Sequence, residues 1–157
     1  MTSHKKDALG HEVLTFTLGD EAYGLDILKV QELRGYERVT QLANLPAYIR
    51  GVINLRGAIV PVIDLRLRLG MPELEYGPHT VVIVLNLASQ TIGLVVDGVA
   101  DVLTLKEEQL SPAPSMAASV GAAFITGLAT VGDRMLILVD IEKLLSAKEL
   151  DLATQVA

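Results

Sequence analysis

Two halves of the chain carry the same series of patterns, and this internal repeat restricts the possible folds more than any other feature of the sequence. A run of Ala, aromatic, Ile, any residue and Gly occurs at Ala47–Gly51 and again at Ala123–Gly127. Two apolar stretches around a short turn follow each run. An aspartate suited to cap a helix, Asp64 or Asp140, then comes at the same distance from the glycine in both halves. The repeat predicts two similar structural units.

The residues that precede these runs align as well. Phe16–Gly24 and Leu85–Gly93 have the same length, and the three residues Val30, Glu32 and Leu33 fall on Val99, Asp101 and Val102. Short alternating stretches with turn residues at this spacing are typical of small β-barrels. We therefore predict a mainly β fold of two similar barrel lobes with a seam between them, together with short helical turns.

The best internal boundary is the polar segment 70–79, which contains two prolines and two glycines. It divides the chain into a first lobe of about residues 12–79 and a second lobe of about residues 80–145. Residues 1–11 are polar and are expected to form a disordered tail. A C-terminal helix, capped by Asp140, is expected over about residues 141–152.

The composition excludes several classes of function. Half of the 157 residues are hydrophobic, so a substantial core is available. The net charge of −6 argues against a nucleic-acid backbone or an anionic membrane as the main partner. Because the chain has no cysteine, it has no disulfide framework, thiolate metal site or cysteine nucleophile. No signal peptide or membrane span is predicted, and the protein is expected to be soluble.

Enzyme chemistry finds little support in the residue pattern. Of the three histidines, His4 and His11 lie in the tail and His79 lies in a turn-rich connector. Since none has a second ligand at a metal-binding spacing, neither a metal site nor a cofactor is predicted. Asp97 follows two valines, as the catalytic residue of an aspartic protease does, but Leu28 occupies the matching position of the first half. Asp97–Gly98 is therefore interpreted as a turn.

The repeat identifies one residue that the fold does not require. Arg56 aligns with Gly132, so the second hairpin closes without an arginine. Arg56 could pair with Glu32 if the two hairpins meet. A surface pair of this kind adds little to stability. We therefore hypothesise that the pair orients side chains and sets specificity at a protein-binding patch.

Four arginines, Arg50, Arg56, Arg66 and Arg68, form a local basic cluster in the sequence. The favoured interpretation of this cluster is a solvated face with glutamate partners. Because the matching helix of the second half reads IEKL, the charge on the helix 65–68 is expected to be free to vary.

Longer motifs carry a resemblance to a known family. The runs are FTLGDEAYGLDILKVQELRGYERVTQLAN from Phe16, GVINLRGAIVPVIDLR from Gly51, TVVIVLNL from Thr80, VVDGVADVL from Val95 and GDRMLILVDIEKLL from Gly132. Together they cover nearly everything after the tail, and the pattern NLRG-x-x-x-P-x-x-D-L-R is specific to this family. The chain resembles the CheW-like domain family, which includes the coupling proteins of bacterial chemotaxis.

The resemblance implies both a fold and a function. The fold would be one CheW-like domain over residues 12–157, made of two SH3-like five-stranded β-barrel lobes packed together. The function would be that of a scaffold in two-component signal transduction, without catalysis or cofactor. Such an adaptor is cytoplasmic and is recruited to membrane-associated receptor arrays. It couples the cytoplasmic tips of chemoreceptors to the regulatory domain of the histidine kinase CheA, with neither nucleic-acid binding nor membrane insertion.

The resemblance also implies site residues by motif. The receptor-binding residues would be Val30, Glu32, Leu33, Arg56, Thr80, Val81 and Val82. Other motif positions are Gly57, Gly93, Val99 and Val102, and the two glycines could serve turns only. The kinase contact is assigned to no single residue.

Two alternatives stay open at this point. CheW-like domains also occur within CheA kinases and response-regulator fusions, but the free-standing adaptor is preferred because the chain has no phosphotransfer, ATP-binding or phospho-acceptor segment. The second alternative is a ligand-binding or enzymatic β-barrel that uses Asp97 or Asp101.

Overall fold

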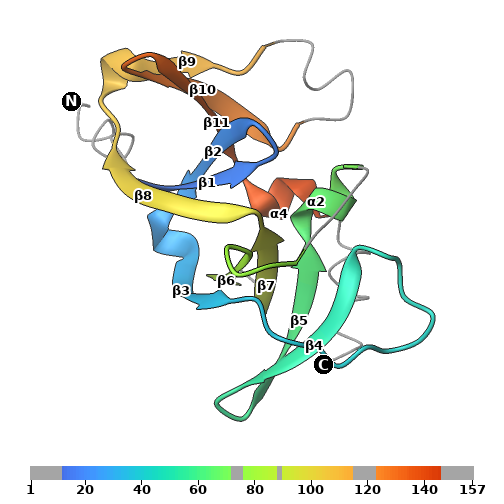
Figure 1. Cartoon of the computed structure of the whole chain (residues 1–157). Coiled ribbons are helices and arrows are strands. Elements are labelled where there is room, and N and C mark those ends of the chain that lie inside the picture. Colours follow the sequence, from blue (N-terminus) through green and yellow to red (C-terminus); the bar gives the residue numbers. More distant parts are fainter. Residues whose placement is uncertain (1–11, 72–75, 88–89, 115–122, 146–157) are drawn as a thin grey trace. The chain divides into compact units, whose positions relative to one another are not determined.

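The computed structural model describes residues 12–71, 76–87, 90–114 and 123–145 (Figure 1). The fold is mainly β, as predicted, and its strands form two sheets. The chain divides into two compact units. Unit 1 contains Met1–Ile27 and Val99–Leu144, and unit 2 contains Leu28–Gly98 and Leu145–Ala157. In the described part of the chain, no helix has the length and apolar character that a membrane crossing requires.

Unit 2 is built on a five-stranded sheet with the order β3-β6-β7-β5-β4. Its strands are β3 (Val30–Gly35), β4 (Ile49–Leu55), β5 (Ala58–Asp64), β6 (Val81–Asn86) and β7 (Thr91–Val96). The short helix α2 (Leu65–Arg68) follows β5, and the 3-10 turn η1 (Ile27–Lys29) precedes β3. Valines from β5, β6 and β7 fill the interior together with Leu55 of β4 and Val39, which follows β3: the valines are Val60, Val62, Val82, Val84 and Val95.

The sheet of unit 2 curls because the chain leaving one edge strand pairs with the other. Thr40 follows β3 and exchanges two backbone hydrogen bonds of 2.9 and 3.0 Å with Val52 in β4. Gly51 makes this approach possible. Its φ is +145°, and a Cβ there would lie only 2.1 Å from the carbonyl oxygen of Thr40.

Unit 1 contains a six-stranded sheet with the order β8-β1-β2-β11-β10-β9. The strands are β1 (Glu12–Leu18), β2 (Glu21–Asp26), β8 (Gly98–Thr104), β9 (Leu110–Pro112), β10 (Ile125–Val131) and β11 (Arg134–Val139). The 3-10 turn η2 (Glu107–Gln109) leads into β9, and the helix α4 (Ile141–Leu144) follows β11. Val13, Leu105, Ala129 and Leu136 form a buried cluster in this unit.

Five strands of the unit 1 sheet, β8-β1-β2-β11-β10, have the same order and register as the unit 2 sheet, which confirms the repeat, and β9 is a sixth strand of unit 1. Gly24 lies opposite Thr15 in the hairpin β1–β2, just as Gly93 lies opposite Val84 in the hairpin β6–β7. Both sheets also contain one parallel pair, β2 with β11 and β7 with β5. A register shift precedes the repeat glycine in each case, between Ile49 and Gly51 and between Ile125 and Gly127.

The predicted lobe boundaries at 12–79 and 80–145 do not match these sheets. The first hairpin of each half joins the sheet of the other half, so β1–β2 lies with β8–β11 and β6–β7 lies with β3–β5. The crossings are short. One is the turn η1 (Ile27–Lys29), and the other is Asp97, the single residue between β7 and β8. Segments this short carry no sequence signal for a change of sheet, and the prediction therefore followed chain order.

The two predicted helix caps are confirmed. Asp64 has an extended backbone, and its carboxylate accepts hydrogen bonds from the N–H groups of Arg66 and Leu67 at the start of α2. Asp140 accepts from the N–H of Glu142 at 2.9 Å at the start of α4. Of the predicted C-terminal helix, Ile141–Leu144 is helical, and residues 146–152, like the predicted tail 1–11, lie outside the described residues.

Candidate functional site

The turn between β4 and β5 places Arg56 in a backbone conformation that favours glycine. Leu55 pairs with Ala58, so the loop is Arg56–Gly57 alone, and φ is +52° at Arg56 and +90° at Gly57. Two successive positive φ values are the mark of a type I′ turn. Asn54 supports it by accepting a 2.9 Å hydrogen bond from the N–H of Gly57. Gly132, the residue that corresponds to Arg56 in the repeat, has φ +62°. The backbone conformation at this position therefore favours glycine, whereas the first hairpin has arginine there.

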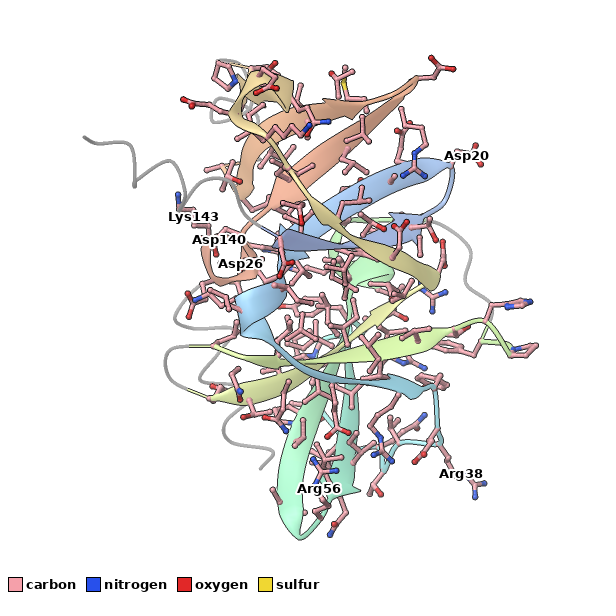
Figure 2. All side chains as sticks on the ribbon, turned by 90° about the vertical axis from the view of Figure 1, so that its left-hand side faces the viewer. Asp20, Asp26, Arg38, Arg56, Asp140 and Lys143 are labelled. Atoms are coloured by element: carbon pink, nitrogen blue, oxygen red, sulfur yellow. The ribbon has the colours of Figure 1, made fainter. Side chains whose placement is uncertain are left out.

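Arg56 reaches from this turn to β3 and forms an ion pair with Glu32, which confirms the predicted contact. Its Nη2 lies 2.5 Å from Oε2 of Glu32, and its Nη1 lies 3.5 Å from Oε1. The pair connects the two edge strands of the unit 2 sheet, since Arg56 follows β4 and Glu32 belongs to β3. Figure 2 shows Arg56 at the end of the β4–β5 hairpin. The side chain of Arg56 remains 65% exposed, so part of the guanidinium is open to a partner.

The ion pair extends along β3 into a row of alternating charges. Arg34 lies 3.9 Å from Glu32, and its Nη2 donates to Glu37 at 3.1 Å. The hydrogen bond from Arg56 is the largest cause that lowers the pKa of Glu32 below its ordinary value, and the charges of Arg56 and Arg34 add to it. Glu32 in turn raises the pKa of Arg56. Both groups are therefore charged at neutral pH.

The predicted receptor-binding residues do not share one face of the sheet. Directly paired residues project to the same side, and Glu32 pairs with Val84, which belongs to the interior cluster. Leu33 and Val81 project to the opposite side and are exposed and half-buried, respectively. Val30 pairs with Leu85 on that same apolar side. Charged residues thus line one side of β3, and apolar residues line the other.

Other predicted residues lie beneath the surface or in the other unit. Thr80 and Val82 are only 5% and 3% exposed, so their side chains support the site and do not face a partner. Gly93 is required by packing, because a Cβ there would lie 2.9 Å from Val82. Val99 and Val102 belong to β8 of unit 1, and Val102 is exposed.

Arg66 corrects the interpretation of the basic cluster as a solvated face. Its side chain is 3% exposed and binds Asp64 at both ends, with Nε 3.0 Å from Oδ1 and Nη2 3.0 Å from Oδ2. Its Nη1 also donates to Asp97 at 2.8 Å. The charge at this position is thus not free to vary. The sequence carried no signal for this burial, because it depends in part on Asp97, which lies 31 positions further along the chain.

Tyr76 completes this buried cluster. Its hydroxyl donates to Oδ2 of Asp64 at 2.6 Å, and its ring centroid lies 4.9 Å from the guanidinium carbon of Arg66. Burial raises the pKa of Tyr76 to about 12, and the hydrogen bond to Asp64 contributes to the increase. Burial alone would lower the pKa of Arg66, but its bonds to Asp64 and Asp97 outweigh burial and raise it. The sequence reasoning missed Tyr76 because no pattern placed it near Asp64.

The two carboxylates of the enzymatic alternative are engaged in separate units. Asp97 binds Arg66 in unit 2. Asp101 belongs to unit 1, where its N–H donates to the hydroxyl of Thr15 at 3.0 Å and its carboxylate accepts from that hydroxyl at 2.7 Å. Within the described ranges, no group of three or more acidic or histidine side chains is placed to hold a metal ion. The geometry gives this alternative no support.

Comparison with known proteins decides the family. Residues 12–149 match the model of the CheW-like domain. The chain belongs to the CheW-like domain family. It is 56% identical to chemotaxis protein CheW of Klebsiella aerogenes over 151 residues, which are 96% of this chain and 91% of that protein. It is 36% identical to chemotaxis protein CheW of Rhizobium meliloti, across 92% of this chain and 93% of that one.

A solved structure of a CheW-like protein has the same fold. The scaffolding protein TtCheW from Thermoanaerobacter tengcongensis superimposes with a TM-score of 0.81 at 33% identity, across 89% of this chain and 95% of that chain. The resemblance drawn from the motifs is therefore confirmed, and with it the mainly β fold with two SH3-like lobes. The chain is a CheW-like scaffold protein of the chemotaxis system.

Proposed function

We propose that the chain is a non-catalytic adaptor that couples the cytoplasmic tips of chemoreceptors to the regulatory domain of the histidine kinase CheA. It works in the cytoplasm and joins membrane-associated receptor arrays. Two observations support this function: the high identity to proteins named chemotaxis protein CheW, and the similarity to a CheW described as a scaffolding protein. An adaptor needs binding surfaces and no reacting groups, so the remaining question is which residues make contact.

Arg56 carries the proposed assignment of the receptor contact. It is exposed, it adopts a conformation that favours glycine, and its counterpart in the repeat is Gly132. The turn thus closes without this side chain, and an exposed ion pair adds little to stability. A charged group that the fold does not need, held by Glu32 in a defined orientation, suits recognition of a partner.

The proposed receptor surface has a charged side and an apolar side. Its exposed and half-buried members are Val30, Glu32, Leu33, Arg56 and Val81. Thr80 and Val82 belong to it as buried supports. We assign the kinase contact to no residue.

The test is calorimetric titration of the chain with a receptor-tip fragment and, separately, with the kinase regulatory domain. We expect Arg56→Glu to weaken receptor binding by about tenfold or more, because a charge at a contact is reversed. Kinase binding should stay near that of wild type, and the thermal midpoint should change by less than about 2 °C.

Arg134→Glu is the matched control. Arg134 is exposed at the start of β11, in the repeat hairpin of unit 1, and its reversal changes the net charge by the same amount. It should leave receptor binding unchanged. Equal effects of the two reversals would assign the loss to net charge and contradict a contact at Arg56. Binding of the wild-type chain to neither fragment, together with an activity lost on Asp97→Asn, would favour the enzymatic alternative.

A further inference from the structure

Tyr76 lies outside the proposed receptor surface, yet it connects β3 with the buried ion pair of α2. Its ring centroid lies 4.3 Å from that of Tyr36, and its hydroxyl donates to Asp64 at 2.6 Å. Tyr36 is the first residue after β3. The contacts therefore run without a gap from Asp64 through the two tyrosine rings, which we call the tyrosine link, to the end of β3.

A backbone hydrogen bond also holds Tyr36 at the end of β3. The N–H of Tyr36 donates to the carbonyl oxygen of Thr80 at 3.0 Å. Thr80 is itself fixed to Gly77, because its hydroxyl accepts from the N–H of Gly77 at 2.9 Å and its own N–H donates to the Gly77 carbonyl at 3.1 Å. The segment Tyr76–Thr80 thus holds Tyr36 both by its ring and by its backbone. This role explains why Thr80 belongs to the site motif although it is buried.

The end of the link at Asp64 is rigid. Asp64 is fully buried, and its two carboxylate oxygens accept from the side chain of Arg66, from two backbone N–H groups and from Tyr76. A shift of the Tyr76 ring would remove a hydrogen bond from a buried carboxylate, which is costly. The ring of Tyr76 is therefore a fixed support for Tyr36.

The other end of the link, Tyr36, lies on the charged side of β3. Glu32, Arg34 and Tyr36 occupy alternate positions of an extended chain, so their side chains project to the same side. β3 is an edge strand of its sheet, and edge strands are held on one side only. Fixing Tyr36 therefore fixes the strand end next to Arg34 and Glu32.

We propose that Tyr76 is a positioning residue for the receptor contact, which holds β3 through Tyr36 so that Glu32 meets Arg56 in one geometry. This inference rests on the proposed function of Arg56. It predicts that loss of the tyrosine link loosens the Glu32–Arg56 pair without altering either residue.

The test combines two readouts on the full chain carrying Tyr76→Leu. The first is the pKa of the Glu32 carboxylate, followed by NMR, which should rise toward its ordinary value because the hydrogen bond from Arg56 is weakened. The second is the affinity for the receptor-tip fragment, which should fall about fivefold, as for mutations that act through packed neighbours. Tyr76→Phe keeps the ring but loses its hydroxyl bond to Asp64, so it should move both readouts in the same direction as Tyr76→Leu and by less.

Two further variants keep the test decisive. Tyr36→Leu removes the same ring contact and leaves Asp64 paired, so it serves if Tyr76→Leu does not fold. Tyr23→Leu removes the stack of Tyr23 on Phe16 in unit 1, where the centroids are 5.6 Å apart, and it should not move the pKa of Glu32. An unchanged Glu32 pKa in Tyr76→Leu or Tyr36→Leu overturns the positioning role, whatever the receptor affinity. An equal shift in Tyr23→Leu also overturns it, because general loosening would then be the cause.

The outcome for the proposed function is separate. If Arg56→Glu binds the receptor fragment as wild type does, the receptor contact at Arg56 is wrong. The Glu32 titration still reports whether the tyrosine link holds β3.

Discussion

At the scale of single residues, the repeat separates what the fold requires from what a partner can use. Gly51 is required, since no side chain fits beside the Thr40 carbonyl, and its counterpart Gly127 keeps the same place in the register. Arg56 is not required, since Gly132 closes the matching hairpin. The Glu32–Arg56 contact could be predicted from the sequence for this reason. The location of Glu32 on the edge strand β3 could not be predicted, because it depends on which strands pair.

Tyr76 gives a pH prediction at this scale. Its ordinary pKa of 10.0 is raised to about 12 in the folded chain, so the neutral phenol is favoured by folding. The stability that its hydroxyl contributes is fully present below the unfolded pKa of about 10 and is lost as the pH rises through the folded pKa. Tyr76→Phe should therefore be less stable than wild type near pH 8, and the difference should shrink between about pH 10 and pH 12.

Urea unfolding of both proteins across this range measures the effect. Other groups that titrate at alkaline pH, such as Tyr23, are present in both chains and cancel in the difference. A difference that stays constant from about pH 8 to pH 12 would show that the hydroxyl of Tyr76 does not ionise differently in the two states.

At the scale of elements, the four-residue helix α2 is held by its buried ion pair more than by its length. The N-cap Asp64 was predictable from its position, and its counterpart Asp140 caps α4 in the same way. The burial of Arg66 was not predictable, because arginines at 66 and 68 in the pattern LRLR read as a charged helix face. Burial depends on Tyr76 and Asp97, which lie 10 and 31 positions further along the chain and outside the helix.

Arg66→Met tests this element. It leaves the carboxylate of Asp64 buried without its cation, and the free energy of unfolding should fall by about 3–5 kcal/mol. Arg68→Met is the control on the same helix. Its guanidinium lies over the ring of Tyr48 at 5.7 Å and is more exposed, so its loss should cost less than about 1 kcal/mol. Chemical denaturation measures the free energy of unfolding of each variant. Equal losses in the two variants would show that the buried Arg66–Asp64 pair stabilises the chain no more than the exposed Arg68 does.

At the scale of the whole chain, the two halves of the sequence repeat do not coincide with the two structural units. The strands, the hairpins and the repeat follow from alternation, turn residues and equal spacing, so they could be predicted. The exchange of first hairpins could not be, because η1 (Ile27–Lys29) and Asp97 are too short to reveal that the chain changes sheet. Each half of the sequence therefore supplies strands to both units.

This exchange predicts how the chain behaves when it is cut. A fragment of residues 1–79 lacks β6 and β7, and a fragment of residues 80–157 lacks β1 and β2. Neither fragment can complete a sheet, so each alone should show no cooperative thermal transition, and an equimolar mixture should regain one. A fragment of residues 1–79 that melts cooperatively by itself would mean that the predicted first lobe folds independently of the exchange.

The most direct test of the receptor assignment is amide chemical-shift mapping of the full chain with an unlabelled receptor-tip fragment. We expect the largest changes at residues 30–35, 55–58 and 81 of unit 2, with smaller changes at 76–80 where the tyrosine link supports β3. Changes confined to unit 1, with the Arg56 turn unaffected, would contradict a receptor contact at the Glu32–Arg56 pair.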